Sequence, residues 1–142
     1  MLERLGCFVE ILEESDDMPD ACFVYDPAFV VPGGVVELRS AKPVRAGEPP
    51  LLTSELAALG VPVVGRLAAP ATADGGDMCW LDASTLAVGR GYRTNQAAID
   101  QLRTLLGPMD VTVESFDMPH DNGPEFCLHL MSVISPVRDD LA

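Results

Sequence analysis

One short stretch of the chain places two acidic side chains around two glycines, in Asp74-Gly75-Gly76-Asp77. It precedes an apolar β-type run, so it does not fit the dinucleotide-binding fingerprint, which follows a strand and opens a helix. A tight turn that directs both carboxylates into a cleft is the functional interpretation. An ordinary β-turn with solvated aspartates is the commoner one, and the segment alone favours it.

A single histidine, His129, lies in an otherwise apolar run at residues 126–131. If the run is a strand, alternation places Cys127, His129 and Met131 on one face. A buried imidazole hydrogen-bonded to a carbonyl is the commoner outcome, and a general acid/base held by a carboxylate is the sharper hypothesis. A zinc site of His120, Cys127 and His129 is a third, but its spacing matches no metal motif.

Arg93 stands at the expected start of a helix. The positive end of the helix dipole disfavours a cation there, so the position suggests a role other than helix stability.

The charge balance narrows the classes of partner. The 142 residues carry 9 Lys and Arg against 22 Asp and Glu, a net charge of −13. Such a surface repels nucleic acid and anionic membranes and favours a cationic ligand. No apolar run is long enough to span a membrane, and the first residues lack the layout of a signal peptide, so we expect one cytoplasmic domain. The four scattered cysteines predict reduced, mostly buried thiols.

The elements that must position these residues follow a repeated pattern of leucines at helical spacing, a Leu-Gly pair and an alternating β-type run. Gly6, Gly60 and Gly107 mark the three copies, about fifty residues apart. Each glycine stands where the end of a helix needs a residue that tolerates positive φ.

Between these glycines the sequence predicts the order β-β-α-β twice. The first unit is expected to have strands at 22–31, 35–39 and 61–66 and a helix at 50–59. The second is expected to have strands at 78–81, 86–89 and 111–116 and a helix at 95–106, capped by Thr94 or Asn95. The apolar stripes that face the sheets are Leu52, Leu56 and Leu59 in the first helix and Ile99, Leu102 and Leu106 in the second.

The pattern predicts one domain, 1–142, made of partial and complete repeats. The end of one repeat is expected at 1–12, complete repeats at 20–66 and 74–116, and the start of a further one, opening with a strand at 126–131, at 126–142. A repeat buries its faces only against neighbours, so we expect a second copy or a further C-terminal half to cover the ends. An α+β domain with coincidental Leu-Gly pairs is the alternative.

Five segments, in order along nearly the whole chain, resemble the guanidino-group-modifying superfamily. They are residues 20–26, the segment around Arg45, and residues 74–77, 93–95 and 128–132. The resemblance is nearest to the dimethylarginine dimethylaminohydrolases and their bacterial relatives, and more distant to the arginine deiminases. Members of this superfamily are closed rings of five ββαβ units around a central active site. The resemblance therefore implies an α/β propeller, of which the chain holds about half.

The resemblance also implies which residues bind the substrate, arginine or an N-methylated arginine. Asp26 would bind the guanidinium group, Asp77 would line its pocket, and Asp20 would contact the α-amino end. Arg45 and Arg93 would hold the substrate carboxylate. This arrangement is physically coherent, because a planar guanidinium group pairs best with fixed carboxylates.

For catalysis, the resemblance implies that His129 is the general acid/base and that Asp74 orients it. In that family a cysteine thiolate attacks the guanidinium carbon, an amine leaves with a proton from the histidine, and water releases a citrulline-like product. None of the four cysteines here matches that nucleophile. We therefore expect the chain to be inactive by itself, and we expect neither a cofactor nor a metal ion.

Two positions depart from the family pattern. Relatives carry a carboxylate where Tyr25 stands, and deiminases and amidinotransferases often carry an aspartate where Met131 stands. The second departure favours a dimethylargininase, and the first leaves the exact guanidine open. The remaining alternatives are a non-catalytic guanidino-binding or assembly half-ring and an arginine amidinotransferase.

Overall fold

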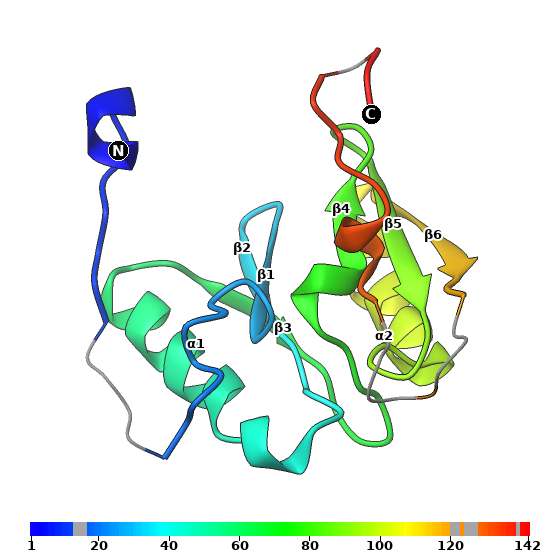
Figure 1. Ribbon diagram of the computed structural model, residues 1–142, viewed down its shortest axis with the longest axis horizontal. Helices are drawn as coiled ribbons and strands as arrows, with labels where there is room; N and C mark the ends of the chain where they lie inside the picture. The colour runs from blue at the N-terminus through cyan, green and yellow to red at the C-terminus, as the bar shows by residue number, and fades with distance from the viewer. Residues whose placement is uncertain (13–16, 120–122, 124–127, 139) are drawn as a thin grey trace.

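The computed structural model describes residues 1–12, 17–119, 123, 128–138 and 140–142 and has an α/β fold (Figure 1). The chain forms two three-stranded sheets, and one helix lies along one side of each sheet. Each sheet with its helix is called a unit below. The first unit contains β1 (Ala28–Val31), β2 (Gly34–Glu37), α1 (Glu48–Ala58) and β3 (Val63–Arg66). The second contains β4 (Met78–Trp80), β5 (Thr85–Arg90), α2 (Gln96–Leu106) and β6 (Thr112–Asp117).

Both units have the same strand pairing. The first two strands form an antiparallel hairpin, and the third strand lies parallel to the second. A parallel neighbour needs a crossover connection, which α1 and α2 supply. In the first hairpin Gly33 has a φ of 82°, a conformation that suits glycine at a tight turn.

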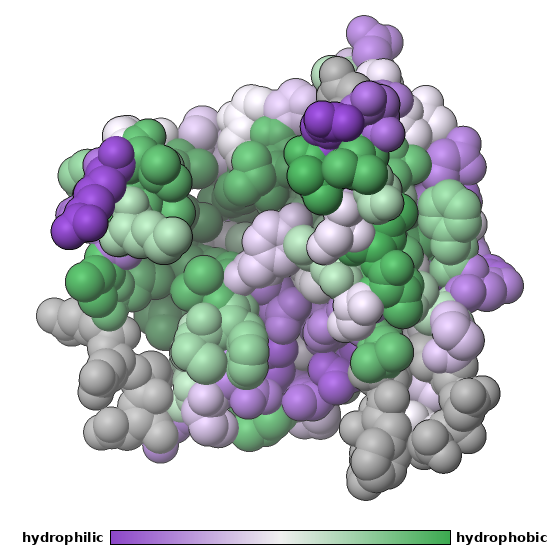
Figure 2. All heavy atoms as spheres, turned by 45° about the horizontal axis from the view of Figure 1, so that its top comes forward, coloured by the Kyte–Doolittle hydropathy of each residue, from purple (hydrophilic) through white to green (hydrophobic). Residues whose placement is uncertain are grey.

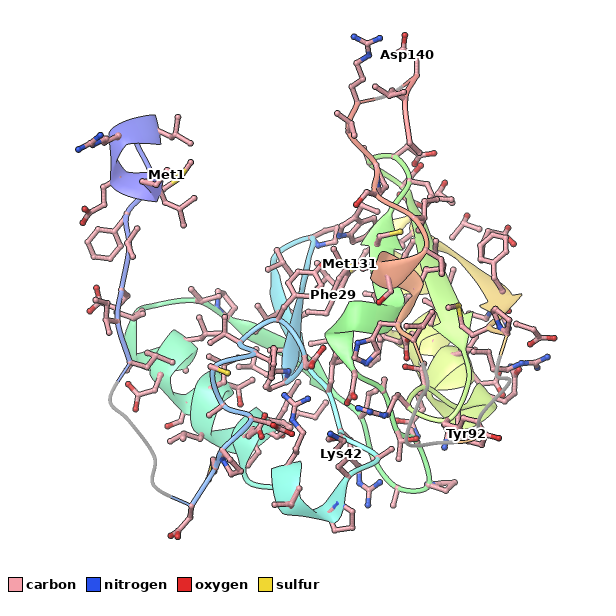
Figure 3. All side chains as sticks on the ribbon, in the orientation of Figure 1. Met1, Phe29, Lys42, Tyr92, Met131 and Asp140 are labelled. Atoms are coloured by element: carbon pink, nitrogen blue, oxygen red, sulfur yellow. The ribbon has the colours of Figure 1, made fainter. Side chains whose placement is uncertain are left out.

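A shared apolar core joins the two sheets. Phe29 of β1 is almost fully buried and stacks on Trp80 of β4, with ring centroids 6.1 Å apart. The indole Nε1 of Trp80 donates a hydrogen bond to the carbonyl of Val30. Figure 3 labels Phe29 at this junction between the units. The loops that carry the acidic residues are thereby held against one another.

The two helices bury different kinds of face. In α2 the predicted stripe is confirmed, because Ile99, Leu102 and Leu106 are fully buried, and the Asn95 side chain accepts a hydrogen bond from the backbone of Ala98 as the N-cap. In α1 the predicted leucine stripe is confirmed only in part, because Leu52 and Leu56 are half-buried and none of its leucines is fully buried. The residues it buries are Glu48, Pro49 and Thr53, while Leu59 is 47% exposed.

The glycine junctions are confirmed at two of three positions. Gly6 and Gly60 both have a φ of 83°, whereas Gly107 has a helical φ of −53° and the left-handed residue is Asp110. The chain after Leu106 continues as a 3-10 turn, Gly107–Met109, so the reversal comes three residues later than predicted.

Three predicted strands differ from the structure. The strand expected at 22–31 begins at Ala28, because residues 18–26 form successive hydrogen-bonded turns. The β-type run expected within 1–12 is irregular and largely exposed after the 3-10 helix Leu2–Leu5. The strand expected at 126–131 is absent from its described part, where Leu130–Ser132 is a 3-10 helix. Residues 126 and 127 lie outside the described residues.

Large hydrophobic side chains are exposed near both ends of the chain. Phe8 is 86% exposed, and Ile11, Val133 and Val137 are exposed as well. Figure 2 shows hydrophobic surface on these parts of the molecule, on either side of a hydrophilic area. No helix among the described residues is long and apolar enough to cross a bilayer.

Candidate active site

The two glycines of the 74–77 segment let two other parts of the chain pack directly on its backbone. A Cβ atom on Gly75 would collide with the carbonyl oxygen of Tyr25, and one on Gly76 would lie 2.6 Å from His129 Nδ1. Side chains larger than hydrogen would therefore displace both neighbours. The segment forms a 3-10 turn, Gly75–Asp77, that leads into β4.

The two carboxylates of this segment are not solvated. Asp74 and Asp77 are both buried, so the interpretation as an ordinary β-turn with solvated aspartates is wrong. The glycines allow the close packing, and this packing removes the acids from water. Each buried carboxylate then needs partners, and each has a different set.

Asp74 lies between His129 and Arg93. Its Oδ2 atom is 3.2 Å from Arg93 Nη1 and 3.5 Å from His129 Nε2. Burial by itself would raise the pKa of Asp74, but the contacts with His129 and Arg93 outweigh it and hold the pKa below its usual value. The contact with Asp74 raises the pKa of His129 above its usual value, against the effect of partial burial. His129 therefore keeps its proton to a higher pH than an ordinary histidine.

Two buried polar atoms of this pair have no hydrogen-bond partner among the described residues: Asp74 Oδ1 and His129 Nε2. Leaving a buried polar group unpaired costs about 1–3 kcal/mol, so such atoms are candidates for contact with a ligand. Ligand atoms of Asp26, Asp74 and His129 all lie within 4.8 Å of one another. The three groups could hold a metal ion or the N–H groups of a cationic ligand.

Asp26 is held rigidly from two sides. One oxygen accepts a hydrogen bond from the backbone N–H of Gly76 at 3.0 Å, and the other accepts from Arg45 Nη1 at 2.8 Å. Arg45 also donates to Glu48, from Nε at 2.9 Å and from Nη2 at 2.7 Å. Burial opposes the charge of Arg45, yet the bonds to Glu48 and Asp26 raise its pKa above the usual value. Arg45 is thus buried between two carboxylates of the protein itself.

Sequence reasoning missed Glu48. It lies three residues after Arg45 and begins α1, where the positive end of the helix dipole stabilises a carboxylate. The spacing and the position at a helix start were the available signals, but a lone glutamate there is ordinarily solvated.

Asp77 contacts different groups from Asp74. Its Oδ2 atom accepts a hydrogen bond from the Thr94 hydroxyl at 2.7 Å, and its Oδ1 atom accepts from the backbone N–H of Leu130 at 3.1 Å. Burial raises the pKa of Asp77 above its usual value despite these bonds. Thr94, expected from the sequence only as a helix cap, is after Glu48 the second buried residue of the site that the sequence did not predict.

Asp20 lies at the edge of the cluster. Its side chain is 31% exposed, 3.4 Å from Lys42 Nζ and 3.9 Å from Arg45 Nε. The structure therefore brings six of the seven predicted site residues into one contact network and places the seventh at its solvent-facing side. These six are Asp26, Arg45, Asp74, Asp77, Arg93 and His129.

The described cysteines do not resemble a reactive pair. Cys79 is buried, and its burial raises the pKa of its thiol above the usual value. Cys7 and Cys22 are exposed, which contradicts the expectation of mostly buried thiols. Cys127 and His120 lie outside the described residues, and with them two of the three ligands of the zinc hypothesis.

The network carries an excess of negative charge. Asp26, Glu48, Asp74 and Asp77 are buried together with Arg45, and Arg93 is largely buried beside them. Four carboxylates against two guanidinium groups leave a charge of −2 when His129 is neutral. A cationic ligand would therefore be bound favourably here, and protonation of His129 offsets one of the two charges.

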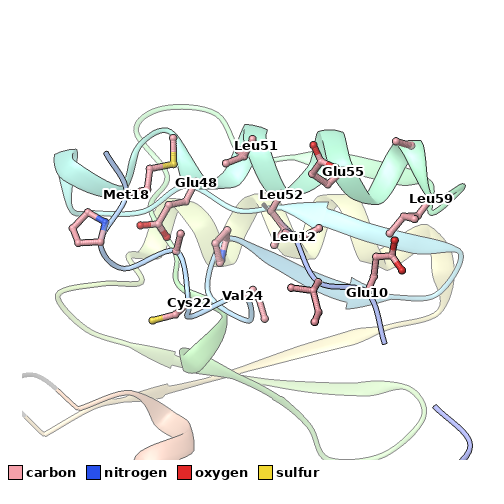
Figure 4. Close-up of a pocket in the computed structure, with 15 residues that line it drawn as sticks. Glu10, Leu12, Met18, Cys22, Val24, Glu48, Leu51, Leu52, Glu55 and Leu59 are labelled. Carbon is pink, nitrogen blue, oxygen red and sulfur yellow. The ribbon is translucent and has the colours of Figure 1, made fainter. Parts of the chain in front are cut away.

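A groove runs along α1, apart from His129 and Asp74 (Figure 4). The helix face with Leu51, Leu52 and Leu59 forms one wall, and the N-terminal segment with Glu10 and Leu12 lies opposite. Glu48 lines one end of the groove and also bonds Arg45, so it links the groove with the charged network.

The chain is similar to proteins that act on guanidino compounds. No family model matches it. It is 30% identical over 148 residues to the dimethylarginine dimethylaminohydrolase of Streptomyces coelicolor, covering 97% of this chain and 54% of that protein. It is 30% identical over 115 residues to the protein of that name from Mycobacterium tuberculosis, covering 80% of this chain and 37% of that protein. The chain spans about half the length, or less, of these relatives.

Solved structures share the fold. A Cys-to-Ser mutant of the dimethylarginine dimethylaminohydrolase of Pseudomonas aeruginosa, complexed with citrulline, has a TM-score of 0.71 at 23% identity, over 82% of this chain and 43% of that one. The N-terminal domain of ArgZ, a cyanobacterial arginine dihydrolase, bound to substrate, has a TM-score of 0.72 at 21% identity, over 84% of this chain and 43% of that one.

Over the matched region the fold is therefore that of these dimethylarginine dimethylaminohydrolase and arginine dihydrolase structures. In sequence the chain is similar to dimethylarginine dimethylaminohydrolases, as its motifs predict.

Proposed function

We propose that this chain binds the guanidinium group of arginine or an N-methylated arginine and supplies the acid/base part of an amidine-hydrolysing site. The observation that supports this most strongly is the convergence of Asp26, Asp74 and His129 within 4.8 Å. Asp74 Oδ1 is buried there without a hydrogen-bond partner among the described residues, and His129 Nε2 has only the 3.5 Å contact with Asp74 Oδ2. A guanidinium ion has planar N–H donors and one positive charge, which suits fixed carboxylates in a network of net negative charge.

The substrate-binding roles follow from the contacts of each residue. Asp26, fixed by Gly76 and Arg45, is the guanidinium ligand. Asp77, fixed by Thr94 and by the backbone of Leu130, lines the guanidinium pocket. Asp20, the most exposed acid of the site, is available to the α-amino group. Arg93 bonds Asp74 through Nη1 but is less buried than Arg45, and we assign it to the substrate carboxylate. Arg45 would serve that purpose only by breaking a bond to Glu48 or Asp26, so we assign it chiefly to holding Asp26.

In the reaction of this family, as the resemblance implies it, a thiolate forms a C–S bond to the guanidinium carbon. The C–N bond then breaks, and the amine leaves with a proton from the histidine. Water subsequently forms a C–O bond, the C–S bond breaks and the thiol is regenerated. We propose that His129, oriented by Asp74, transfers these protons. Cys79, with its buried thiol of raised pKa, is unsuited to be the nucleophile. We therefore propose that these 142 residues bind without turnover.

We also propose that the two units are successive blades of a five-bladed α/β propeller. Exposed apolar residues near both ends of the chain, among them Phe8 and Val137, suit contacts with neighbouring blades. A second copy or a further C-terminal half would supply those blades. A purely binding or assembly role is the second candidate that this exposure favours, and the cytoplasmic location stays a prediction.

The experiment is calorimetric titration of the purified chain with L-arginine and Nω,Nω-dimethyl-L-arginine, with L-lysine as the matched cation that lacks a guanidinium group. We expect heat from a guanidino ligand, binding at least about tenfold weaker in Asp26→Asn, and no citrulline or ornithine-type product in parallel assays. Equal binding of lysine would contradict a guanidinium site. Turnover by the chain would contradict the proposal that it binds its ligand without catalysis. Turnover that required an acceptor amine would indicate amidinotransfer.

A further inference from the structure

We propose that Thr94 is a positioning residue for the His129–Asp74 pair, acting through one buried hydroxyl on which both members depend. The inference rests on the proposed function, in which this pair transfers protons. Thr94 precedes Asn95, which is the residue that caps α2. The Thr94 hydroxyl is therefore not used to begin the helix, and its bonds lead into the site instead.

The Thr94 hydroxyl both donates and accepts a hydrogen bond. Thr94 is fully buried, and its Oγ1 atom donates to Asp77 Oδ2 at 2.7 Å. The same oxygen accepts a hydrogen bond from the backbone N–H of Asp74 at 3.3 Å. A hydroxyl is the smallest side-chain group that donates and accepts at once, so only serine or threonine fits this position. Thr94 thereby fixes both ends of the 74–77 turn.

The connection continues to His129 through Asp77. The second oxygen of Asp77, Oδ1, accepts from the backbone N–H of Leu130, the residue directly after His129. This bond anchors the start of the 3-10 helix Leu130–Ser132. Asp74 is held through its own N–H and His129 through that of its neighbour, and both bonds end on the Thr94–Asp77 pair. The separation of the acid and the imidazole thus depends on one hydroxyl group.

Loss of the hydroxyl has a defined consequence. Asp77 Oδ2 would be buried without a donor, so this carboxylate would rotate or take up a proton. Either change weakens the support that the charge of Asp77 gives to the protonated form of His129, and the contact between His129 and Asp74 loosens. Both effects act in the same direction. We expect the pKa of His129 to fall by about half a unit to one unit.

The test is NMR titration of the His129 imidazole protons. The chain has only two histidines, so a His129→Gln variant assigns the signal. Thr94→Val removes the hydroxyl at nearly constant shape and is expected to lower the pKa. Thr94→Ser keeps the hydroxyl and is expected to match the wild type. Thr53→Val removes another buried threonine hydroxyl, bonded to Glu37 in the first unit, and is expected to leave the pKa unchanged.

An unchanged pKa in a folded Thr94→Val chain overturns the proposal, and so does an equal shift in Thr94→Ser or Thr53→Val. If Thr94→Val does not fold, Thr94→Cys, which keeps the volume and replaces the hydroxyl by a weakly bonding thiol, is judged by the same criteria. Addition of L-arginine to the wild type separates the two claims. A chain that binds no arginine, but whose pKa falls with Thr94→Val, disproves the proposed function and leaves the positioning role standing.

Discussion

The two units share one order of strands and helices, yet different interactions hold them together. In the second unit Leu102 and Leu106 of α2 are fully buried against the sheet, and β5 and β6 pair over six residues. The buried face of α1 is instead partly polar, with Glu48 and Thr53, and β2 and β3 pair over three residues with a register shift. Both sheets bury apolar residues, but α2 adds an apolar face of its own, whereas the start of α1 adds a network of buried charges.

The difference indicates a division of labour at the site. The second unit provides a rigid frame for the 74–77 segment, because β4 and β5 are buried on the core. The first unit positions Asp26 through Arg45, whose ion pairs are buried. Buried ion pairs contribute little net stability because desolvation offsets their attraction, but they fix geometry. The charge network of the first unit therefore serves mainly to fix the position of Asp26.

The largest expected effect comes from removing the charge at the centre of the first unit. Arg45→Ala leaves Asp26 and Glu48 buried without their cation, and should lower the free energy of unfolding by about 3–5 kcal/mol. Urea denaturation measures this. The control is Arg66→Ala, which breaks an exposed pair with Glu37 and should cost about 1 kcal/mol or less. Equal losses would mean that the network is not a structural centre.

A leucine from each helix tests the contrast directly. Leu102→Ala in α2 empties a fully buried site and should cost about 2–4 kcal/mol. Leu51→Ala in α1 removes a side chain that is 39% exposed and should cost less than about 1 kcal/mol. Similar unfolding midpoints for the two variants would show that both units rest on apolar packing.

The N-cap of α2 should have an intermediate effect. Asn95 accepts from the backbone of Ala98 and of Thr72, so Asn95→Ala should cost about 1–2 kcal/mol. Ser54→Ala, at an exposed position of α1, serves as the control and should be nearly neutral. A neutral Asn95→Ala, measured by thermal unfolding, would contradict the role of this cap in the rigid frame.

The smallest effect is the pH dependence of the His129–Asp74 contact. The pKa of His129 is raised in the folded chain, so its contribution is complete below the unfolded value of about 6.5 and is lost as the pH rises through the folded value. The pKa of Asp74 is lowered, so its contribution is lost only in acid. The stability difference between the wild type and His129→Gln should thus be largest near pH 5–6. A difference that grows toward pH 9 would refute this assignment.

The second unit could be predicted from the sequence more fully than the first. Apolar spacing at Ile99 and Leu102 and the cap at Asn95 are local signals, and the structure follows them. The apolar residues before β1 predicted a long strand. Turns occupy residues 18–26 instead, because this part of the chain packs on the backbone of Gly75. The buried face of α1 depends on Arg45 pairing with Glu48, a tertiary contact with no periodic signal.

The candidate site was likewise predictable where local motifs define it and not where tertiary contacts do. The resemblance named Asp26, Asp74 and His129, and the structure brings them together. It could not reveal that Arg45 donates to protein carboxylates or that the Thr94 hydroxyl joins Asp77 to the 74–77 turn. Those contacts arise between segments far apart in sequence, and no motif encodes their hydrogen-bond directions.

The most direct test of the account is whether one guanidinium ion occupies the space between Asp26, Asp74 and His129. The measurement is NMR titration of the chain with L-arginine at neutral pH, following the His129 imidazole signal. We predict a saturable shift with arginine that is lost in Asp26→Asn and is not produced by L-lysine. An unshifted His129 signal at saturating arginine, or an equal shift with lysine, would contradict the guanidinium site.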